Sequence, residues 1–160
     1  MPACGTRIRT AARGSTPAAG ARVCVTGTAA ERDRTLTVLA SMRAPAENLA
    51  GRLSLSGLTG LLSRSRVVVS NDTGPLYLAA AVGTPTVGIY WIVNLIGYGP
   101  LTRARHRPAV SWRTDCPTCG ADQIHSSCNH TASIVADVPS DEVTASALDL
   151  FNQGFGHIEP

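Results

Sequence analysis

Hydrophobic patterns of two different periods alternate along the chain, and they predict strands and helices in turn. Three consecutive valines at 67–69 form the β-branched run typical of a strand that is covered on both faces. Turn-forming residues follow at 71–74, and the next apolar stretch predicts a short helix that ends at Gly83. A second apolar strand then runs to Tyr90. Because a helix N-terminus after a buried strand exposes backbone amides, this segment is either an anion site or a plain strand–helix connection.

The same patterns assign most of the remaining chain. Apolar runs predict strands at 22–26 and 107–112, and apolar spacings of three and four predict helices at 30–42, 53–62 and 140–152. Ser54 and Ser140 are the expected N-caps of the last two helices. The less regular intervals are expected to form a turn at 44–47, a loop at 91–100 and a brief strand or extended segment at 134–138.

This order of elements predicts an α/β fold, with a Rossmann-like parallel sheet and helices on both of its faces. Ligands of such sheets bind outside the carboxyl ends of the strands, which here are followed by residues 27–31, 71–77 and 90–100. The glycine-rich dinucleotide fingerprint is absent from 27–31, and the chain has no Walker A sequence. The sequence therefore excludes the glycine-rich dinucleotide-binding site and the P-loop nucleotide-binding site.

Composition narrows the class of protein. Hydrophobic residues make up 44% of the 160 residues and charged residues 16%, which indicates a globular domain. All 14 basic residues are arginine, and the net charge of +3 is too small to indicate nucleic-acid binding. No apolar run reaches the ~18 residues of a membrane span. Five cysteines are an odd number, which argues against a disulfide framework and predicts a cytoplasmic protein. Residues 1–21 read as an irregular leader and 153–160 as a tail.

The segment 70–85, Ser-Asn-Asp-Thr-Gly-Pro-Leu-Tyr-Leu-Ala-Ala-Ala-Val-Gly-Thr-Pro, resembles the signature segment of glycosyltransferase family 9, the heptosyltransferases. Three weaker segments resemble the family in the same order. They are the strand, glycine and acid at 25–31, the Asn-Leu-x-Gly linker and helix at 48–62, and the cysteine loop and closing helix at 116–143. The resemblance covers about residues 22–152.

The resemblance implies the C-terminal half of a GT-B glycosyltransferase, which binds a nucleotide-sugar donor, typically ADP-heptose in this family. It implies that the backbone of residues 73–76 cradles the diphosphate, that Glu31 binds the ribose, and that Gly27 lets the nucleotide approach. The implied substrate-binding residues are Gly27, Glu31, Asp72, Thr73, Gly74, Pro75, Leu76 and Tyr77. The acceptor would be a hydroxyl of a glycan or glycolipid, as in the synthesis of lipopolysaccharide or another cell-surface glycan. No metal or other cofactor is required for this reaction.

Three departures from the family pattern qualify these expectations. The part that resembles the family lacks its N-terminal domain, which supplies the acceptor site and the general base, so no catalytic residue is expected in this chain. Tyr77 replaces a histidine that contacts the phosphates, and the sequence at 90–94 replaces the family's usual Gly-Pro-Thr turn. A non-catalytic nucleotide-binding module, or a truncated relic that lacks the N-terminal acceptor domain, therefore stays open as an alternative. Expected partners are an N-terminal domain or a second copy, through apolar residues such as Ile92, Leu95 and Ile96, and peripheral membrane contact also stays open.

The loop around Cys116-Pro117-Thr118-Cys119-Gly120 holds a second kind of candidate chemistry. Cys116, Cys119, Cys128 and His130 are thiol and imidazole groups that could form a tetrahedral zinc site, which would make the chain a zinc-binding interaction protein. The spacing of the first two cysteines is also that of a redox pair. The sequence favours free thiols, because only one knuckle is present, and leaves zinc and redox chemistry as alternatives.

Overall fold

The computed structural model describes residues 20–126 and 128–154, so the predicted leader up to residue 19 and the tail from residue 155 lie outside the described residues. Strands and helices alternate along most of the chain. In chain order they are β1 (Val23–Val25), η3 (Ala29–Glu31), α1 (Arg32–Ala40), β2 (Ala46–Asn48), α2 (Leu55–Ser63), β3 (Val68–Asn71), α3 (Gly74–Ala81), β4 (Thr86–Trp91), α4 (Ile92–Tyr98), β5 (His106–Ser111) and α5 (Ser140–Gln153).

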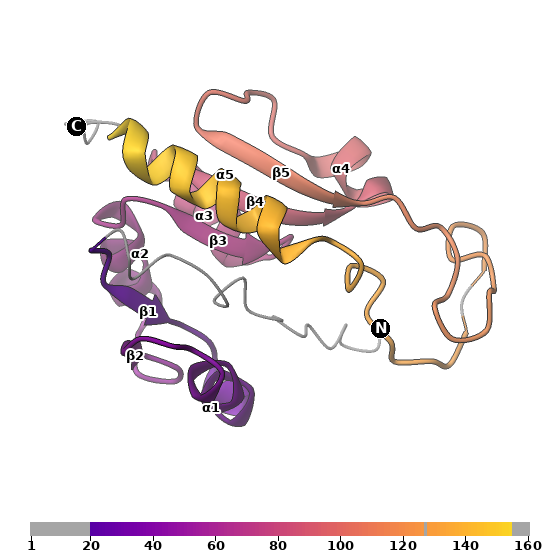
Figure 1. Ribbon diagram of the computed structural model, residues 1–160, viewed down its shortest axis with the longest axis horizontal. Coiled ribbons are helices and arrows are strands. Elements are labelled where there is room, and N and C mark those ends of the chain that lie inside the picture. Colours follow the sequence, from indigo (N-terminus) through magenta and orange to yellow (C-terminus); the bar gives the residue numbers. More distant parts are fainter. Residues whose placement is uncertain (1–19, 127, 155–160) are drawn as a thin grey trace.

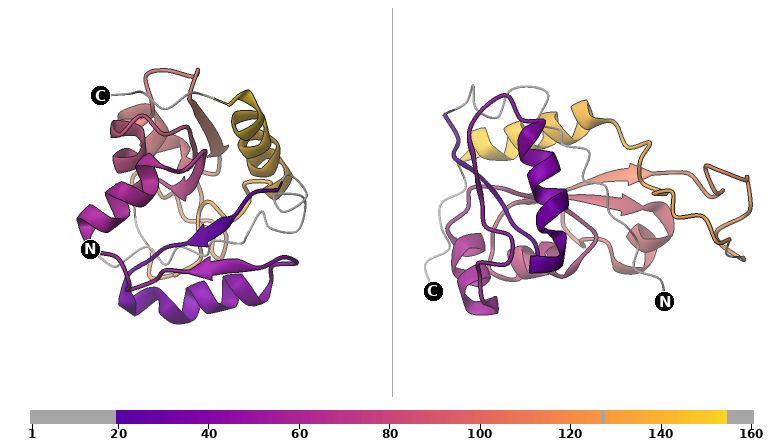
Figure 2. Two further views of the ribbon diagram at one scale, coloured as in Figure 1. Left: turned by 90° about the vertical axis from the view of Figure 1, so that its left-hand side faces the viewer. Right: turned by 90° about the horizontal axis from the view of Figure 1, so that it is seen from below.

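All strand pairs are parallel, which confirms the α/β class, but the strands divide into two sheets. In the described residues β1 pairs with β2, and β3, β4 and β5 form a second sheet in that order. Helix α5 covers one face of the larger sheet and α3 covers the other, as Figures 1 and 2 show. Helix α1 packs on β2. The predicted arrangement of helices on both faces is therefore present in the larger sheet.

The core lies between α5 and the larger sheet. Its buried members come from β4, β5 and α5, and they are Val87, Ala109, Val143, Ala147 and Leu150. Each of these side chains is at most 4% exposed. The inward stripe of α5 follows the helical spacing that the sequence showed, so burial of this stripe fixes the helix against the sheet.

Helix termini follow local sequence rules in some places and depart from them in others. Ser54 caps α2 as predicted, and its hydroxyl accepts a hydrogen bond from the amide of Gly57 at 3.1 Å. The prediction for Ser140 was wrong, because Pro139 occupies the N-cap position and Ser140 is the first helical residue of α5. Proline lacks a side-chain acceptor, so this helix starts without a side-chain cap.

Three irregular intervals were assigned wrongly. The predicted turn at 44–47 overlaps β2, which is held by pairing with β1. The predicted loop at 91–100 contains helix α4, which packs on β4 and β5. Residues 134–138 form turns and not an extended segment. The conformations of β2 and α4 depend on contacts with other elements of the fold, which the local sequence does not show.

Within the described ranges, no helix has both the length and the hydropathy that crossing a membrane would require.

Candidate functional site

The β3–α3 turn presents an open helix N-terminus at the carboxyl end of β3. Thr73 occupies the N-cap position, but its hydroxyl makes no capping bond. That hydroxyl lies 3.2 Å from the hydroxyl of Ser70 and donates a 3.2 Å bond to the carbonyl of Asn71. Thr73 and Gly74 are exposed, and a Cβ atom added to Gly74 would meet nothing within 4 Å. The backbone at the start of α3 is therefore accessible to a ligand.

Asp72 precedes this turn, and its carboxylate is engaged by two neighbours. The hydroxyl of Tyr77 donates a hydrogen bond to Oδ1, and the side-chain amide of Asn94 donates one to Oδ2 at 2.7 Å. Partial burial of the Tyr77 hydroxyl and the adjacent carboxylate raise the pKa of Tyr77 above its ordinary value. Tyr77 therefore stays protonated at neutral pH and acts as a donor that ties α3 to Asp72.

Gly27 and Glu31 lie after β1. The Glu31 carboxylate accepts bonds from the amide of Thr28 at 2.8 Å and from its hydroxyl at 2.9 Å. These two donors, the amide first, hold the pKa of Glu31 below its ordinary value. The carbonyl of Gly27 accepts a 2.9 Å bond from the amide of Gly51, which lies close to Ala29 in a left-handed conformation. Close backbone packing thus forms a compact turn around the exposed Gly27.

The structure brings some of the predicted site residues together and separates others. Asp72 and Tyr77 are in contact, while Thr73, Gly74 and Pro75 form the adjoining turn. Leu76 is only 2% exposed, so its side chain belongs to the core. Gly27 and Glu31 follow β1, which lies in the other sheet of the described residues. The two halves of the predicted donor site therefore sit on separate sheets.

Asn94 is a site residue that the sequence analysis missed. Residues 91–100 were expected to form a loop, so Asn94 was not placed opposite Asp72. A usable signal was present, because Asn94 is the one polar residue between Ile92 and Ile96 in an apolar run that directly follows a strand. A buried or half-buried amide in such a run usually has a hydrogen-bond partner.

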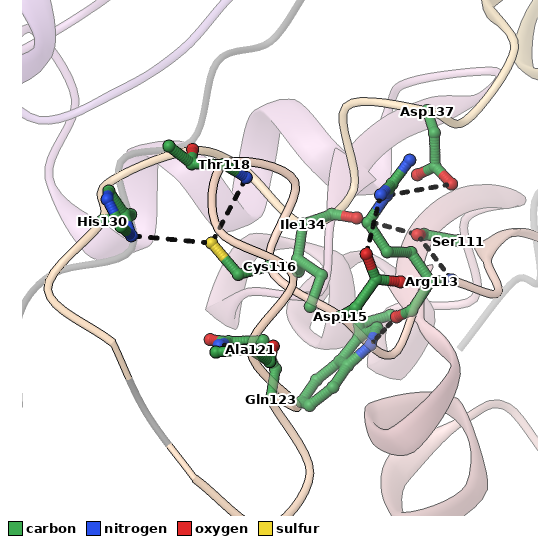
Figure 3. Close-up of polar contacts among 11 residues, drawn as sticks. Ser111, Arg113, Asp115, Cys116, Thr118, Ala121, Gln123, His130, Ile134 and Asp137 are labelled. Carbon is green, nitrogen blue, oxygen red and sulfur yellow. Dashed lines mark hydrogen bonds and ion pairs between the residues drawn. The ribbon is translucent and has the colours of Figure 1, made fainter.

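The cysteine loop follows β5 and extends beyond the carboxyl edge of the larger sheet (Figure 1). One ligand atom from each of Cys116, Cys119, Cys128 and His130 lies within 4.8 Å of all the others. Hydrogen bonds to the Cys116 sulfur from the amide of Thr118, and then from that of Cys119, lower the pKa of Cys116 to about 6. Figure 3 shows the Cys116 sulfur between Thr118 and His130. The three cysteines are free thiols in this structure.

A pocket of about 340 Å³ lies between α3 and residues 98–102. Tyr77 and Tyr90 line it from one side, and Thr86 and His106 line it at the amino ends of β4 and β5. A nucleotide at the start of α3 would lie at the opposite, carboxyl ends of the strands. Leu76 and Tyr77 belong to the predicted donor-binding residues and also line the pocket, so the pocket adjoins that site, although residues 73–75 are not part of its lining.

His106 at this pocket should make stability depend on pH. Burial, and next the charge of Arg105, lower the pKa of His106 below its ordinary value of 6.5. The unfolded chain then binds more protons than the folded one as pH falls, so stability should begin to drop as pH falls below about 7.5 and continue to drop until His106 is protonated in the folded state as well. His106→Gln should remove part of that drop in urea unfolding midpoints. Parallel midpoint curves for the wild type and the variant would contradict this prediction.

Comparisons with known proteins agree with one another. The model of "Glycosyltransferase family 9 (heptosyltransferase)" matches residues 15–119. The lipopolysaccharide core heptosyltransferase OpsX of Haemophilus influenzae is 40% identical over 53 residues, which are 33% of this chain and 15% of that protein. This chain therefore spans only a small part of that curated relative.

Solved structures show the same fold. The glycosyl transferase family 9 protein from Veillonella parvula aligns with a TM-score of 0.69 and 19% identity, over 85% of this chain and 38% of that one. The E. coli ADP-heptose lps heptosyltransferase II aligns with a TM-score of 0.61 and 22% identity, over 84% of this chain and 38% of that one. The fold is thus that of part of a GT-B glycosyltransferase, and the family match over residues 15–119 shows that the chain belongs to glycosyltransferase family 9.

Proposed function

We propose that this chain binds the nucleoside diphosphate of a nucleotide-sugar donor, of the ADP-sugar type, at the β3–α3 turn. The observation that carries the proposal is the exposed start of α3, where Thr73 leaves the helix without a side-chain cap and Gly74 opens onto free space. Helix N-termini bind phosphate groups because their first amides lack partners inside the helix.

Electrostatics around the turn support this assignment. The positive end of the α3 dipole favours an anion. Asp72 would oppose one, but both of its carboxylate oxygens accept hydrogen bonds from Tyr77 and Asn94. These bonds hold the carboxylate between the Tyr77 hydroxyl of α3 and the Asn94 amide of α4. The space beside Gly74 is thereby available to the ligand. In this proposal Tyr77 holds Asp72 in position and does not contact the phosphate directly.

The complete reaction extends beyond this chain. In our proposal an acceptor hydroxyl of a glycan or glycolipid forms a bond to the anomeric carbon of the sugar as the bond to the diphosphate breaks. A general base outside this chain takes the hydroxyl proton, and the start of α3 stabilises the departing diphosphate. Glu31 would accept hydrogen bonds from the ribose hydroxyls, which requires the turn after β1 to approach the larger sheet. No metal is needed for these steps. A cytoplasmic location would suit a nucleotide-sugar donor.

Titration calorimetry with ADP tests the proposal. Gly74→Val should weaken ADP binding at least about tenfold, because its side chain would occupy the space that a phosphate needs. Gly97→Val is the matched control, since a Cβ atom at Gly97 also meets nothing within 4 Å but lies in α4. ADP is used because it lacks the sugar, so a contact between α4 and the sugar cannot affect the comparison of the two variants.

Two outcomes would overturn the donor assignment. One is the absence of ADP binding by wild-type protein that unfolds cooperatively and is therefore folded. The other is equal ADP affinity in Gly74→Val and Gly97→Val. If ADP binds as expected, a transfer assay on the full-length enzyme separates a glycosyltransferase from a non-catalytic nucleotide-binding module.

A further inference from the structure

We propose that Cys116, Cys119, Cys128 and His130 bind one zinc ion in a structural site. This proposal is independent of the donor site. The four side chains supply three sulfurs and one imidazole nitrogen, all within 4.8 Å of one another. A zinc tetrahedron with Zn–S bonds of about 2.3 Å would place neighbouring sulfurs about 3.8 Å apart. The four groups therefore need to close by about 1 Å or less to reach the geometry of a bound ion.

The backbone around the first two cysteines already has the form of a metal knuckle. The amide of Thr118 points to the Cys116 sulfur at 3.4 Å, and the amide of Gly120 donates a 2.9 Å bond to the Cys116 carbonyl. Gly120 has a φ of +73°, a conformation that glycine adopts without strain. The tight turn keeps the sulfurs of Cys116 and Cys119 on one side, and its amide donors offset negative charge on sulfur.

The second half of the site comes from Cys128 and His130, which lie in the part of the loop that returns toward α5. The Cys116 sulfur lies 3.8 Å from Nδ1 of His130 (Figure 3). Cys128 is oriented by the side-chain amide of Gln123, which lies 3.5 Å from its sulfur. An antiparallel bridge between Asp115 and Asp122 holds the base of the knuckle. The two pairs of ligands thus approach each other from two ordered segments.

Contacts at the root of the loop hold its two ends together. The hydroxyl of Ser111 donates a 2.8 Å bond to the carbonyl of Ile134, and Arg113 lies 4.0 Å from Asp137 (Figure 3). Between these ends, residues 114–126 and 128–133 contain no helix and no strand longer than the bridge. Irregular loops of this length are uncommon in compact domains, and a bound metal would contribute free energy to the folding of this one.

A closed metal site explains the set of ligands better than a redox pair does. A disulfide would use two sulfurs and would leave the third sulfur and the imidazole unexplained. Three soft thiolates together with one imidazole are a ligand set that suits zinc, and they fill all four positions. No position is left for water or substrate, so the role is structural. The thiol protons pass to the solvent when the metal binds.

The test measures metal in the full chain, purified in reducing buffer without chelator. We expect elemental mass spectrometry to find about one equivalent of zinc per chain. Cobalt(II) in place of zinc should give the visible bands of tetrahedral coordination together with thiolate-to-cobalt charge transfer. Cys119→Ser and His130→Asn should each lose at least about tenfold in zinc affinity.

Two variants serve as matched controls. His125 lies in the same loop, but its Nδ1 is 2.6 Å from Asp122, and it lies outside the ligand set. Cys24 is an exposed thiol on β1. His125→Asn and Cys24→Ser should both keep wild-type zinc content and cobalt spectra.

Several results would overturn the zinc proposal. The first is a zinc content below about a tenth of an equivalent after folded wild-type protein has been saturated with zinc and desalted. The second is equal zinc affinity in His130→Asn and His125→Asn. The third is a Cys116–Cys119 disulfide that persists in place of the metal. Should a ligand variant fail to fold, release of zinc from wild-type protein by a thiol-modifying reagent gives the same answer. Release in step with modification of the three loop cysteines supports the site, and modification without zinc release contradicts it.

Discussion

Leu150→Ala is expected to lower the free energy of unfolding by about 2–5 kcal/mol. Leu150 is 1% exposed and lies in the core between α5 and the larger sheet, with Val87 and Ala109 among its cluster. The substitution removes buried methyl groups and leaves a cavity, because neighbouring side chains relax only in part. The effect should be large since this core is the one that joins α5 to β4 and β5.

Urea unfolding followed by circular dichroism measures this loss. Leu55→Ala is the control, because Leu55 is 73% exposed on α2 and its replacement should change stability by about 0.5 kcal/mol or less. Equal shifts of the unfolding midpoint in the two variants, with unchanged m-values, would contradict the assignment of Leu150 to the core.

Gly88→Ala is expected to destabilise the protein by about 1–3 kcal/mol through overpacking. A Cβ atom at Gly88 would overlap a ring carbon of Tyr90 and would lie 2.8 Å from a methyl carbon of Leu76. Both neighbours are at most 3% exposed, so neither side chain has free space to move into. Glycine at this position lets α3 pack closely on β4, and that packing positions the start of α3.

Gly60→Ala is the matched control and should have the opposite sign. A Cβ atom at Gly60 meets only the Arg64 guanidinium, at 3.7 Å, and the residue lies inside helix α2. Alanine in an unstrained helix position should raise stability by up to about 1 kcal/mol. Thermal and urea unfolding of both variants measure the difference. A destabilised Gly60→Ala together with an unchanged Gly88→Ala would contradict this account of the packing.

Local sequence patterns predicted the elements whose signals are contained within a few residues. Consecutive β-branched valines mark β3, Ser54 lies where a cap is needed, and Gly83 ends α3 with a left-handed backbone. Such features depend on conformational preferences of adjacent residues, which a sequence shows directly. Helix α4 was missed because the turn residues at 97–100 suggested a loop, while its packing on β4 and β5 stabilises the helix.

The candidate donor site was only partly accessible from the sequence. The resemblance to the family identified residues 72–77 as candidates. The family itself was identified correctly, because the family model matches residues 15–119. The partner of Asp72 could not be derived, since Asn94 lies 22 residues away and reaches Asp72 only when α4 forms beside α3. Placement of Gly27 and Glu31 also depends on how two sheets sit together, which no local pattern encodes.

By itself the sequence determined the alternation of parallel strands and helices, the position of the turn before α3 and the family, because these follow from residue order. The tertiary structure alone decided that Tyr77 and Asn94 engage Asp72, that the strands divide into two sheets, and that three cysteines and His130 converge. Spacing along the chain limits which side chains can meet. Packing of distant segments decides which of them do, since contact requires the backbone between them to fold back.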